Sequence, residues 1–494
     1  MFLKQKRRIL SLIQRLINIL SIYAKSKDNK EIIIDCLDAV DAILNQLYEE
    51  ENTPQISIKK LNDIRIDLNT LLNNHGQVNE EAIENVKRKL INVSEILNEE
   101  IKNKLNVLFL PYKVSMWDSL ESVYKAALND KDCVAKVVPI PYYELSGDKK
   151  IPKYEGNMFP KDIPIIYYKD YDLAAEEPDI IYVHNIYDQY NKITQVYEEY
   201  FTGNLKKYTD MLVYVPYHIS SFIDTGSTKY LAYNIPSIKN VDKVILAGEH
   251  VKAAAIRDGI PEDKLLVLGS PKFDHIINSM KKGVKIPDNW RERIEGKFVF
   301  VLNTGCLFFA NDPYYKVGLL SCILNIPNIV ENSVLIWRPH PLTKISIMRF
   351  TPGLMEYYNT LTTKYIGDDY IYKNVILDET EDYVPVLLMA DVLISSDGSL
   401  LRSYLVTGKK VLYLHDNVAK DSMFLHKNII PSEAFYYFYD KENNWAEVIK
   451  RLAKGDDYLA QKRKKIAEEI YVNLDGTCGE KVYNTIKEHV IKNI

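Results

Sequence analysis

Through residues 1–103 the hydrophobic positions recur at helical spacing, and strand-like apolar runs are nearly absent. One face of the opening segment is marked by Leu10, Ile13, Ile17 and Leu20. The same periodicity continues in EIIIDCLDAVDAILNQLYEE and EEAIENVKRKLINVSEILNEEI, and the polar breaks ENTPQIS and NNHGQVNE separate the segments. This pattern predicts an all-helical appendage at the start of the chain.

The spacing of the hydrophobic residues changes after residue 104. Short and continuously apolar runs such as LNVLFLPY, PDIIYVHN and DMLVYVPYH then alternate with helical segments. A second series of such runs follows residue 280 and includes KFVFVLNTG, SVLIWRPHP and DVLISSDGS. Apolar strands that alternate with helices are typical of parallel sheets covered on both faces. The sequence therefore predicts an α/β protein with two doubly wound, Rossmann-like domains. We expect them at 104–280 and 281–494, the second ending in helices.

Composition supports a globular protein of more than one domain, because 494 residues exceed the size of a single ordinary core. The net charge is −4 and the charges are interspersed, so no nucleic-acid partner is expected. No apolar run is long enough to span a membrane. The basic N-terminal segment is interrupted by Gln14 and Arg15 and lacks a cleavage site, so we expect a cytoplasmic protein.

Several chemistries are disfavoured by what the sequence lacks. The five cysteines are Cys36, Cys133, Cys306, Cys322 and Cys478. They are scattered without a CxxC pair, so neither a disulfide framework nor a zinc site is expected, and no metal or other cofactor is predicted. No HExxH, GxSxG or GxxxxGK[ST] motif occurs, which argues against several hydrolase and nucleotide-hydrolysing classes.

Candidate ligand-binding residues follow the apolar runs, because ligands in open α/β sheets bind beyond the carboxyl ends of the strands. In the second domain Asn303 and Thr304 end one run, and Arg338 and His340 lie in the motif RPHP after the next. A permanent cation and a titratable donor held between two prolines suit a pyrophosphate. The alternative is that Arg338 pairs with a surface carboxylate while His340 caps a neighbouring loop.

A cluster of small and acidic residues separates the run DVLI from the next helical segment. It consists of Ser395, Ser396, Asp397, Gly398 and Ser399. The amides and the dipole at a helix N-terminus attract phosphate, so this turn is predicted to bind a phosphate-bearing ligand. The alternative is an ordinary helix cap, although capping needs only one such residue.

In the first domain His218 follows the run MLVYVPY and is a candidate general base for a hydroxyl acceptor. The alternative is a histidine that fills a polar gap at a domain edge. His184, in IYVHN, is a weaker candidate of the same kind.

These motifs together resemble the CDP-glycerol:poly(glycerol phosphate) glycerophosphotransferases, which are teichoic-acid primases and polymerases of GT-B architecture. The resemblance covers residues 208–490, where GSPKFD is similar to G-x-P-R-x-D, RPHP to R-x-H-P, LISSDGS to L-I-T-D-Y-S-S, and DGTCGEK to D-G-x-x-x-x-R. The chain also departs from the family. Asp397 is displaced by one position, Ser403 stands where an acidic residue is common, and Lys410 replaces a proline. The W-H-G-T-P motif is not visible, and only His218 occupies a comparable place.

The resemblance implies a metal-independent transferase that moves glycerol or ribitol phosphate from a CDP-activated donor to a hydroxyl acceptor, a lipid-linked glycan being one candidate. The reaction would belong to teichoic-acid-like synthesis and would release CMP. Asn303, Thr304, Arg338 and the 395–399 turn would bind the donor, and His218 and His340 would be catalytic. Three alternatives remain: a nucleotide-sugar glycosyltransferase, a sugar-nucleotide 2-epimerase and a non-enzymatic helical scaffold.

The first helical segment carries basic residues beside its apolar face, namely Lys4, Lys6, Arg7, Arg8 and Arg15. This pattern is compatible with a helix that lies on an anionic membrane, which would make the protein peripheral to the inner face of the cell membrane. It is equally compatible with a helix that packs on its neighbours or on a second subunit. The usual behaviour of amphipathic helices in globular proteins favours packing.

Overall fold

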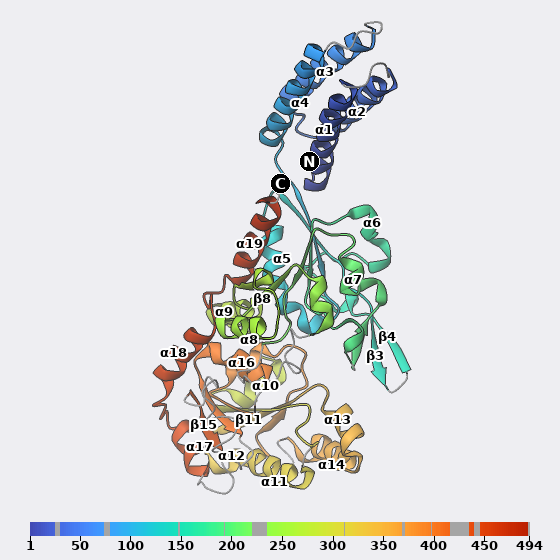
Figure 1. The fold of residues 1–494 in the computed structure, drawn as a ribbon. Coiled ribbons are helices and arrows are strands. Elements are labelled where there is room, and N and C mark those ends of the chain that lie inside the picture. Colours follow the sequence, from blue (N-terminus) through green and yellow to red (C-terminus); the bar gives the residue numbers. More distant parts are fainter. Residues whose placement is uncertain are drawn as a thin grey trace.

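The computed structural model consists of a helical bundle followed by two α/β lobes (Figure 1). It describes residues 1–24, 30–73, 80–146, 149–191, 193–219, 235–310, 312–367, 371–396, 398–414, 434–438 and 445–492. The bundle projects from the first lobe, and the last helix returns to the base of the bundle (Figure 1). The predicted fold class, two Rossmann-like α/β domains behind a helical appendage, is confirmed.

Four helices form the N-terminal bundle, and each is long enough to bury a continuous apolar stripe. They are α1 (Leu3–Tyr23), α2 (Lys30–Tyr48), α3 (Gln55–Asn73) and α4 (Glu80–Glu100). Consecutive helices contact one another and α1 also contacts α4, which closes the bundle. Residues from all four helices, such as Ile13, Ile43, Ile64 and Leu90, share one buried core.

The apolar face of α1 lies inside this bundle and is not available to a membrane. Ile13 and Leu20 are fully buried, and Leu10 and Ile17 pack against the same core. The membrane interpretation of this helix is therefore wrong, and the interpretation that it packs on its neighbours is confirmed. Among the described residues, no helix combines the length and the hydropathy needed to cross a bilayer.

The basic residues of α1 bind the protein itself. Lys6 is 3% exposed and its Nζ donates to the carbonyl oxygens of Asn98 (3.0 Å) and Ile101 (2.9 Å) at the end of α4. Arg7 pairs with Asp210 of the first lobe at 2.8 Å. Lys4 and Arg8 also bond to that lobe, so the cationic side of α1 attaches the bundle to it.

The first lobe contains a six-stranded parallel sheet of order β2-β1-β5-β7-β8-β9. Its strands are β1 (Leu105–Leu110), β2 (Cys133–Val137), β5 (Ile180–Val183), β7 (Met211–Tyr214), β8 (Lys243–Leu246) and β9 (Leu265–Val267). Its principal helices are α5 (Glu121–Leu128), α8 (Glu249–Arg257) and α9 (Pro271–Lys282), with the short helices α6 (Leu173–Glu176) and α7 (Thr202–Leu205). Two apolar cores cover opposite faces of the sheet, as expected for strands that are buried throughout.

A small antiparallel sheet of order β4-β3-β6 extends from this lobe. Its strands are β3 (Tyr142–Ser146), β4 (Lys149–Lys153) and β6 (Thr194–Val196), and β4 forms its exposed edge. The sequence analysis did not identify this sheet.

The second lobe contains a six-stranded parallel sheet of order β12-β11-β10-β13-β14-β15. The strands are β10 (Phe298–Thr304), β11 (Ser333–Pro339), β12 (Val375–Leu377), β13 (Val392–Ser395), β14 (Lys410–Leu414) and β15 (Tyr436–Phe438). The helices are α10 (Asp288–Ile294), α11 (Pro313–Leu324), α12 (Ile326–Ile329), α13 (Thr343–Phe350), α14 (Met355–Thr360), α15 (Val384–Met389), α16 (Ser399–Tyr404), α17 (Trp445–Ala453) and α18 (Ala460–Ile470). This strand order is that of a dinucleotide-binding Rossmann sheet.

The last helix, α19 (Cys478–Lys492), leaves the second lobe and packs against α5 of the first. Its residues Val482, Tyr483 and Ile486 are buried in the core of the first sheet. The expected second domain included this helix, so the chain crosses back between lobes in a way that the division by sequence did not anticipate.

Candidate functional site

The order of the second sheet reverses between β10 and β13, and the crevice beside such a switch point is where α/β sheets bind ligands. Asn303 of β10 is in register with Ser395 of β13, and Thr304 is in register with Pro339 of β11. His340 therefore lies on one side of the end of β10 and the 395–399 turn on the other. At about 4.8 Å per strand, the two are separated by about 10 Å.

Three of the predicted binding residues form hydrogen bonds within the sheet edge. The Oγ1 of Thr304 is fully buried and accepts a bond from Trp337 Nε1 at 3.1 Å. Asn303 donates through Nδ2 to the carbonyl oxygen of Arg338 (3.2 Å) and accepts through Oδ1 from the hydroxyl of the buried Ser395 (3.3 Å). The side chains of Thr304, Asn303 and Ser395 thus fix the strand ends.

The guanidinium of Arg338 is also used internally. Its Nη1 pairs with Asp378, whose side chain is completely buried, and its Nη2 donates to the carbonyl oxygens of Thr380 (2.8 Å) and Glu381 (3.4 Å). These contacts agree with the alternative of a carboxylate partner, although that carboxylate lies in the interior. The expected contact of Arg338 with a phosphate stays a prediction.

His340 has a defined tautomer. Its Nδ1 accepts the amide hydrogen of Leu342 at 3.1 Å, which places the ring proton of the neutral form on Nε2. Burial, and secondarily the charge of Arg338, lower the pKa of His340, so the ring is neutral at neutral pH. The described part of the chain gives Nε2 no partner, so this N–H is a donor available to a ligand.

The predicted phosphate turn is described except for Asp397, which lies outside the described residues. Gly398 occupies the N-cap of α16 with an extended backbone, and apart from its chain neighbours no heavy atom of the described residues lies within 4 Å of a Cβ added there. As a glycine, Gly398 contributes no side-chain cap to this end of the helix. Ser396 is half-buried and Ser399 exposed, and within the described segments neither hydroxyl has a hydrogen-bond partner.

His218 lies beyond the carboxyl end of β7, and its imidazole has no hydrogen-bond partner among the described residues although both ring nitrogens are buried. Burial lowers the pKa of His218 to about 4, and the charges of Arg402 and Lys272 act in the same direction. The ring lines a cavity of about 20 Å³ with Tyr214, Ser270 and other residues, which is room for about one water molecule.

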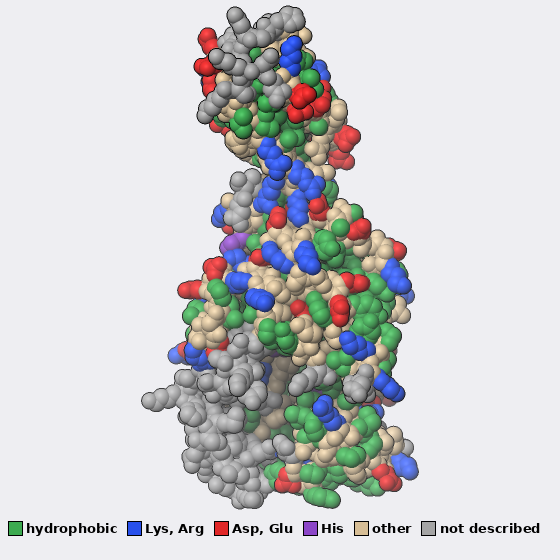
Figure 2. Space-filling model, turned by 45° about the vertical axis from the view of Figure 1, so that its right-hand side comes forward, with side chains coloured by type: hydrophobic (Ala, Val, Ile, Leu, Met, Phe, Trp, Pro, Cys, Tyr) green, Lys and Arg blue, Asp and Glu red, His purple; other side chains and the backbone are tan. Residues whose placement is uncertain are grey.

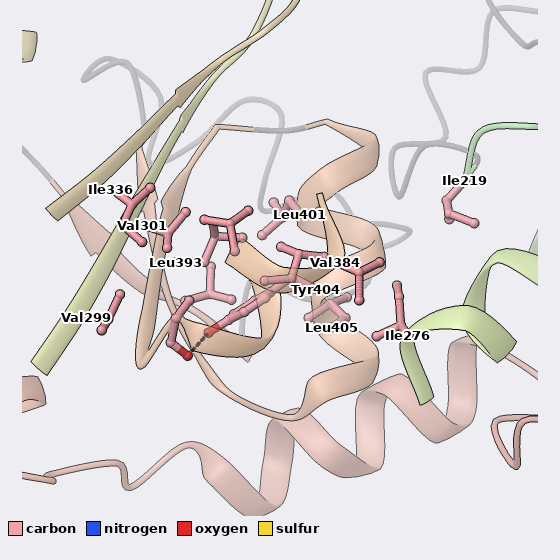
Figure 3. Packing of buried hydrophobic residues seen from close by; sticks show 14 of the residues in the cluster. Ile219, Ile276, Val299, Val301, Ile336, Val384, Leu393, Leu401, Tyr404 and Leu405 are labelled. Carbon is pink, nitrogen blue, oxygen red and sulfur yellow. Dashed lines mark hydrogen bonds between the residues drawn. The ribbon is translucent and has the colours of Figure 1, made fainter. Parts of the chain in front are cut away.

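The segment that carries His218 reaches the second lobe. Arg402 of α16 donates from Nη1 to the carbonyl oxygen of Ile219 at 2.7 Å. The side chain of Ile219 is 1% exposed and belongs to the core of the second lobe together with Leu401 and Tyr404 of α16 (Figure 3). The structure therefore brings His218 beside the helix that follows the predicted phosphate turn.

His184 has a structural environment. It is fully buried, its Nε2 accepts the amide hydrogen of Tyr112 at 3.2 Å, and its Nδ1 lies 3.1 Å from the carbonyl oxygen of Met116. Burial lowers its pKa to about 4. These bonds join the ends of β1 and β5. His184 therefore fills a polar gap, which agrees with the structural alternative to a catalytic role.

A cluster of hydrogen-bonded polar side chains that joins the two lobes was not predicted from the sequence. Lys272 Nζ lies 2.5 Å from Asp118 Oδ2, and the hydroxyl of Tyr383 donates to the same oxygen at 2.6 Å. Lys272 occupies the basic position of the GSPKFD motif, and this position was the sequence feature from which the cluster could have been predicted. The acidic position, Asp274, accepts the amide hydrogens of Cys478 and Gly479 and so holds the start of α19.

The surface is hollowed at the level where the two lobes meet, on the face seen in Figure 2. In the part of the chain that the structure describes, no three His, Cys, Asp or Glu side chains are grouped so that they would hold a metal ion. The described site therefore consists of the histidines His218 and His340, the hydroxyls and amides of the 395–399 turn, and the charged groups of Arg402, Lys272 and Asp118.

No protein-family model matches the sequence, and no curated protein matches it significantly. Similar solved structures include a putative UDP-N-acetylglucosamine 2-epimerase from Listeria monocytogenes, with a TM-score of 0.51 and 16% identity over 79% of this chain and 97% of that one. They also include a variant of the wall teichoic acid polymerase TagF, with a TM-score of 0.51 and 13% identity over 88% of this chain and 98% of that one. At these identities the likeness shows the fold, which is GT-B-like.

Proposed function

We propose that this protein is a transferase that moves a polyol phosphate from a CDP-activated donor, such as CDP-glycerol or CDP-ribitol, to a hydroxyl acceptor and releases CMP. The product would be a teichoic-acid-like cell-wall or surface glycan. The observation that carries the proposal is the buried and partnerless imidazole of His218 beside α16, the helix that begins at the predicted phosphate turn.

The chemistry follows from the state of that imidazole. With a pKa of about 4, His218 is neutral at neutral pH and has a free lone pair for a proton. An anionic donor bound nearby would offset the fields of Arg402 and Lys272 and raise the pKa of His218 toward its ordinary value, which makes the ring a stronger base. His218 would take the proton of the acceptor hydroxyl as that oxygen attacks the β-phosphorus. The bond from the β-phosphorus to the bridging oxygen then breaks, and CMP leaves.

The donor pyrophosphate would bind at the crevice of the second sheet. The Nε2–H of His340 and the hydroxyls of Ser396 and Ser399, with the amides of that turn, are the donors that the described residues leave open. Arg338 would act indirectly, because it holds the loop after β12. Such fixed donors stabilise developing phosphate charge with little reorganisation.

The test is incubation of the full-length protein with CDP-glycerol, CDP-ribitol and UDP-N-acetylglucosamine, followed by chromatographic detection of CMP, UDP and epimerised sugar. We expect CMP release from a CDP-polyol only. The variant His218→Asn should lose CMP release while calorimetry still shows CMP binding, because the base is on the other lobe from the nucleotide site.

Other outcomes select other functions. UDP release without CMP release would identify a nucleotide-sugar glycosyltransferase, and interconversion of the sugar without release would identify a 2-epimerase. A protein that binds none of these nucleotides would favour the scaffold alternative, in which the N-terminal bundle is the functional part.

A further inference from the structure

The helix α13 exposes an unusual combination of side chains. The exposed fractions of Ile345, Met348 and Phe350 are 52%, 58% and 52%. Lys344 and Arg349 alternate with them and are also exposed. The opposite side of the helix is buried through Thr343, Ser346 and Ile347, so Ile345 and Met348 face outward together with the two cations. Phe350 is exposed at the end of the helix.

A second exposed element of the same character belongs to the first lobe. All five residues of β4, Lys-Lys-Ile-Pro-Lys, are exposed, and Ile151 lies between Lys150 and Lys153. Lysine and proline also protect an edge strand from pairing with other chains, which explains part of this composition. Edge protection does not require the exposed isoleucine, and it does not explain α13.

The topology places both elements at the ligand-binding edges of the two sheets. The β3–β4 hairpin follows the carboxyl end of β2, and α13 follows the carboxyl end of β11 directly after His340. Figure 1 shows the hairpin and α13 on the same side of the molecule, one from each lobe. In Figure 2, which turns this side toward the viewer, hydrophobic side chains and Lys or Arg side chains are intermingled over the second lobe.

We propose that this side of the protein, formed by the outer face of α13 and by β4, docks on an anionic lipid bilayer. Large apolar side chains interleaved with Lys and Arg enter the interface between headgroups and acyl chains, and the cations bind anionic headgroups. Lys344 lies 3.5 Å from Glu379, but this exposed ion pair is weak and does not withdraw the lysine from a membrane.

The proposal goes beyond the donor chemistry and does not rest on the identity of the donor. It places the membrane contact on the surface formed by α13 and β4. The helix α1 is not part of that contact, because its apolar face is buried. A membrane at this position would present a lipid-linked acceptor directly to the edges of both sheets.

The experiment is co-sedimentation of the full-length protein with vesicles of phosphatidylcholine alone or mixed with phosphatidylglycerol, at low and high salt. We expect sedimentation only with the mixed vesicles, decreasing with salt. The triple variant Ile345→Ser, Met348→Ser, Phe350→Ser should lose it. The pair Lys149→Gln, Lys150→Gln should weaken partitioning about five-fold for each lysine removed. The matched control replaces the exposed isoleucines of the bundle, Ile22→Ser and Ile66→Ser, and should sediment like the parent.

The substitutions lie on exposed positions, so circular dichroism should confirm that every variant is folded. Failure of the parent protein to sediment with phosphatidylglycerol vesicles would overturn the proposal, as would loss of binding in the bundle control but not in the α13 variant. If light scattering instead showed that the parent is a dimer and the α13 variant a monomer, this face would be a contact between two copies. That result would also overturn the membrane assignment.

Discussion

Replacing Arg338 with methionine tests whether this residue holds the second lobe together or contacts a ligand. Arg338→Met keeps a long apolar stem and removes the guanidinium from Asp378, whose side chain is completely buried. The carboxylate would keep the amide and hydroxyl of Thr380, at 2.9 and 2.6 Å, but would lose its only cation among the described residues. Leaving one charge of a buried pair without its partner costs about 3–5 kcal/mol.

Urea denaturation followed by tryptophan fluorescence is the appropriate assay, because Trp337 is buried next to Arg338 in β11. We expect the free energy of unfolding of the second lobe to fall by about 3–5 kcal/mol. The double variant Arg338→Met, Asp378→Asn is the control, since it leaves no buried charge and should recover more than half of the loss.

The reasoning fails if Arg338→Met stays within about 1 kcal/mol of the parent protein, the range of a surface substitution. It fails equally if the variant is as stable as the parent but no longer binds CMP in a calorimetric titration. Either result would return Arg338 to the role of a ligand-binding cation that the RPHP motif suggested.

Three further predictions concern the turn, the buried histidines and the returning helix. Gly398→Val should weaken CMP binding in calorimetry with little change in stability, because the described residues leave open space for the Cβ. The control is Gly353→Val, at an equally open position away from the turn, which should leave CMP binding unchanged. The pKa of His184 is about 4 in the folded protein against an ordinary 6.5, so only the unfolded chain gains a proton between these values. The contribution of His184 to the free energy of unfolding should therefore fall on acidification from pH 6.5 toward 4 by about 1.4 kcal/mol per unit, and the urea midpoints of His184→Gln should lack this component of the pH dependence. Asp274→Ala removes two amide contacts to a buried carboxylate, so it should cost about 2–4 kcal/mol and speed hydrogen exchange in α19; unchanged exchange would show that α19 is held by apolar packing alone.

Local pattern was sufficient for the architecture. The helical spacing of residues 1–103 predicts the bundle, and the apolar runs after residue 104 predict the strands of both parallel sheets except β15. These features are readable from sequence because burial on both faces of a strand, or on one face of a helix, imposes a period on neighbouring residues. The ends of the strands follow from the same runs, so the candidate residues Asn303, Arg338 and Ser395 lie together at the carboxyl edge of the second sheet.

The hydrogen-bond and ion-pair partners of those strand-end residues depend on contacts between distant parts of the chain. Arg338 and its partner Asp378 are 40 residues apart, and Arg402 meets Ile219 across 183 residues. Contacts between residues so far apart in the sequence leave no periodic pattern along the chain. The local sequence therefore does not distinguish a guanidinium that binds a neighbouring loop from one that faces a phosphate. The amphipathic sequence of α1 is likewise compatible with a membrane surface or with a bundle, and only the contacts of the folded chain show that it packs in the bundle.

The sequence by itself determined most of the elements and the class of the two parallel sheets, since these depend on which residues must leave water. Only the tertiary structure decided which polar side chains at the carboxyl edge of the second sheet have internal partners, that α19 returns to the first lobe, and that His218 lies beside α16. The physical reason is that a hydrogen bond or an ion pair depends on positions within a few tenths of an ångström. Those positions are set by the packing of whole elements and not by the residues nearest in the chain.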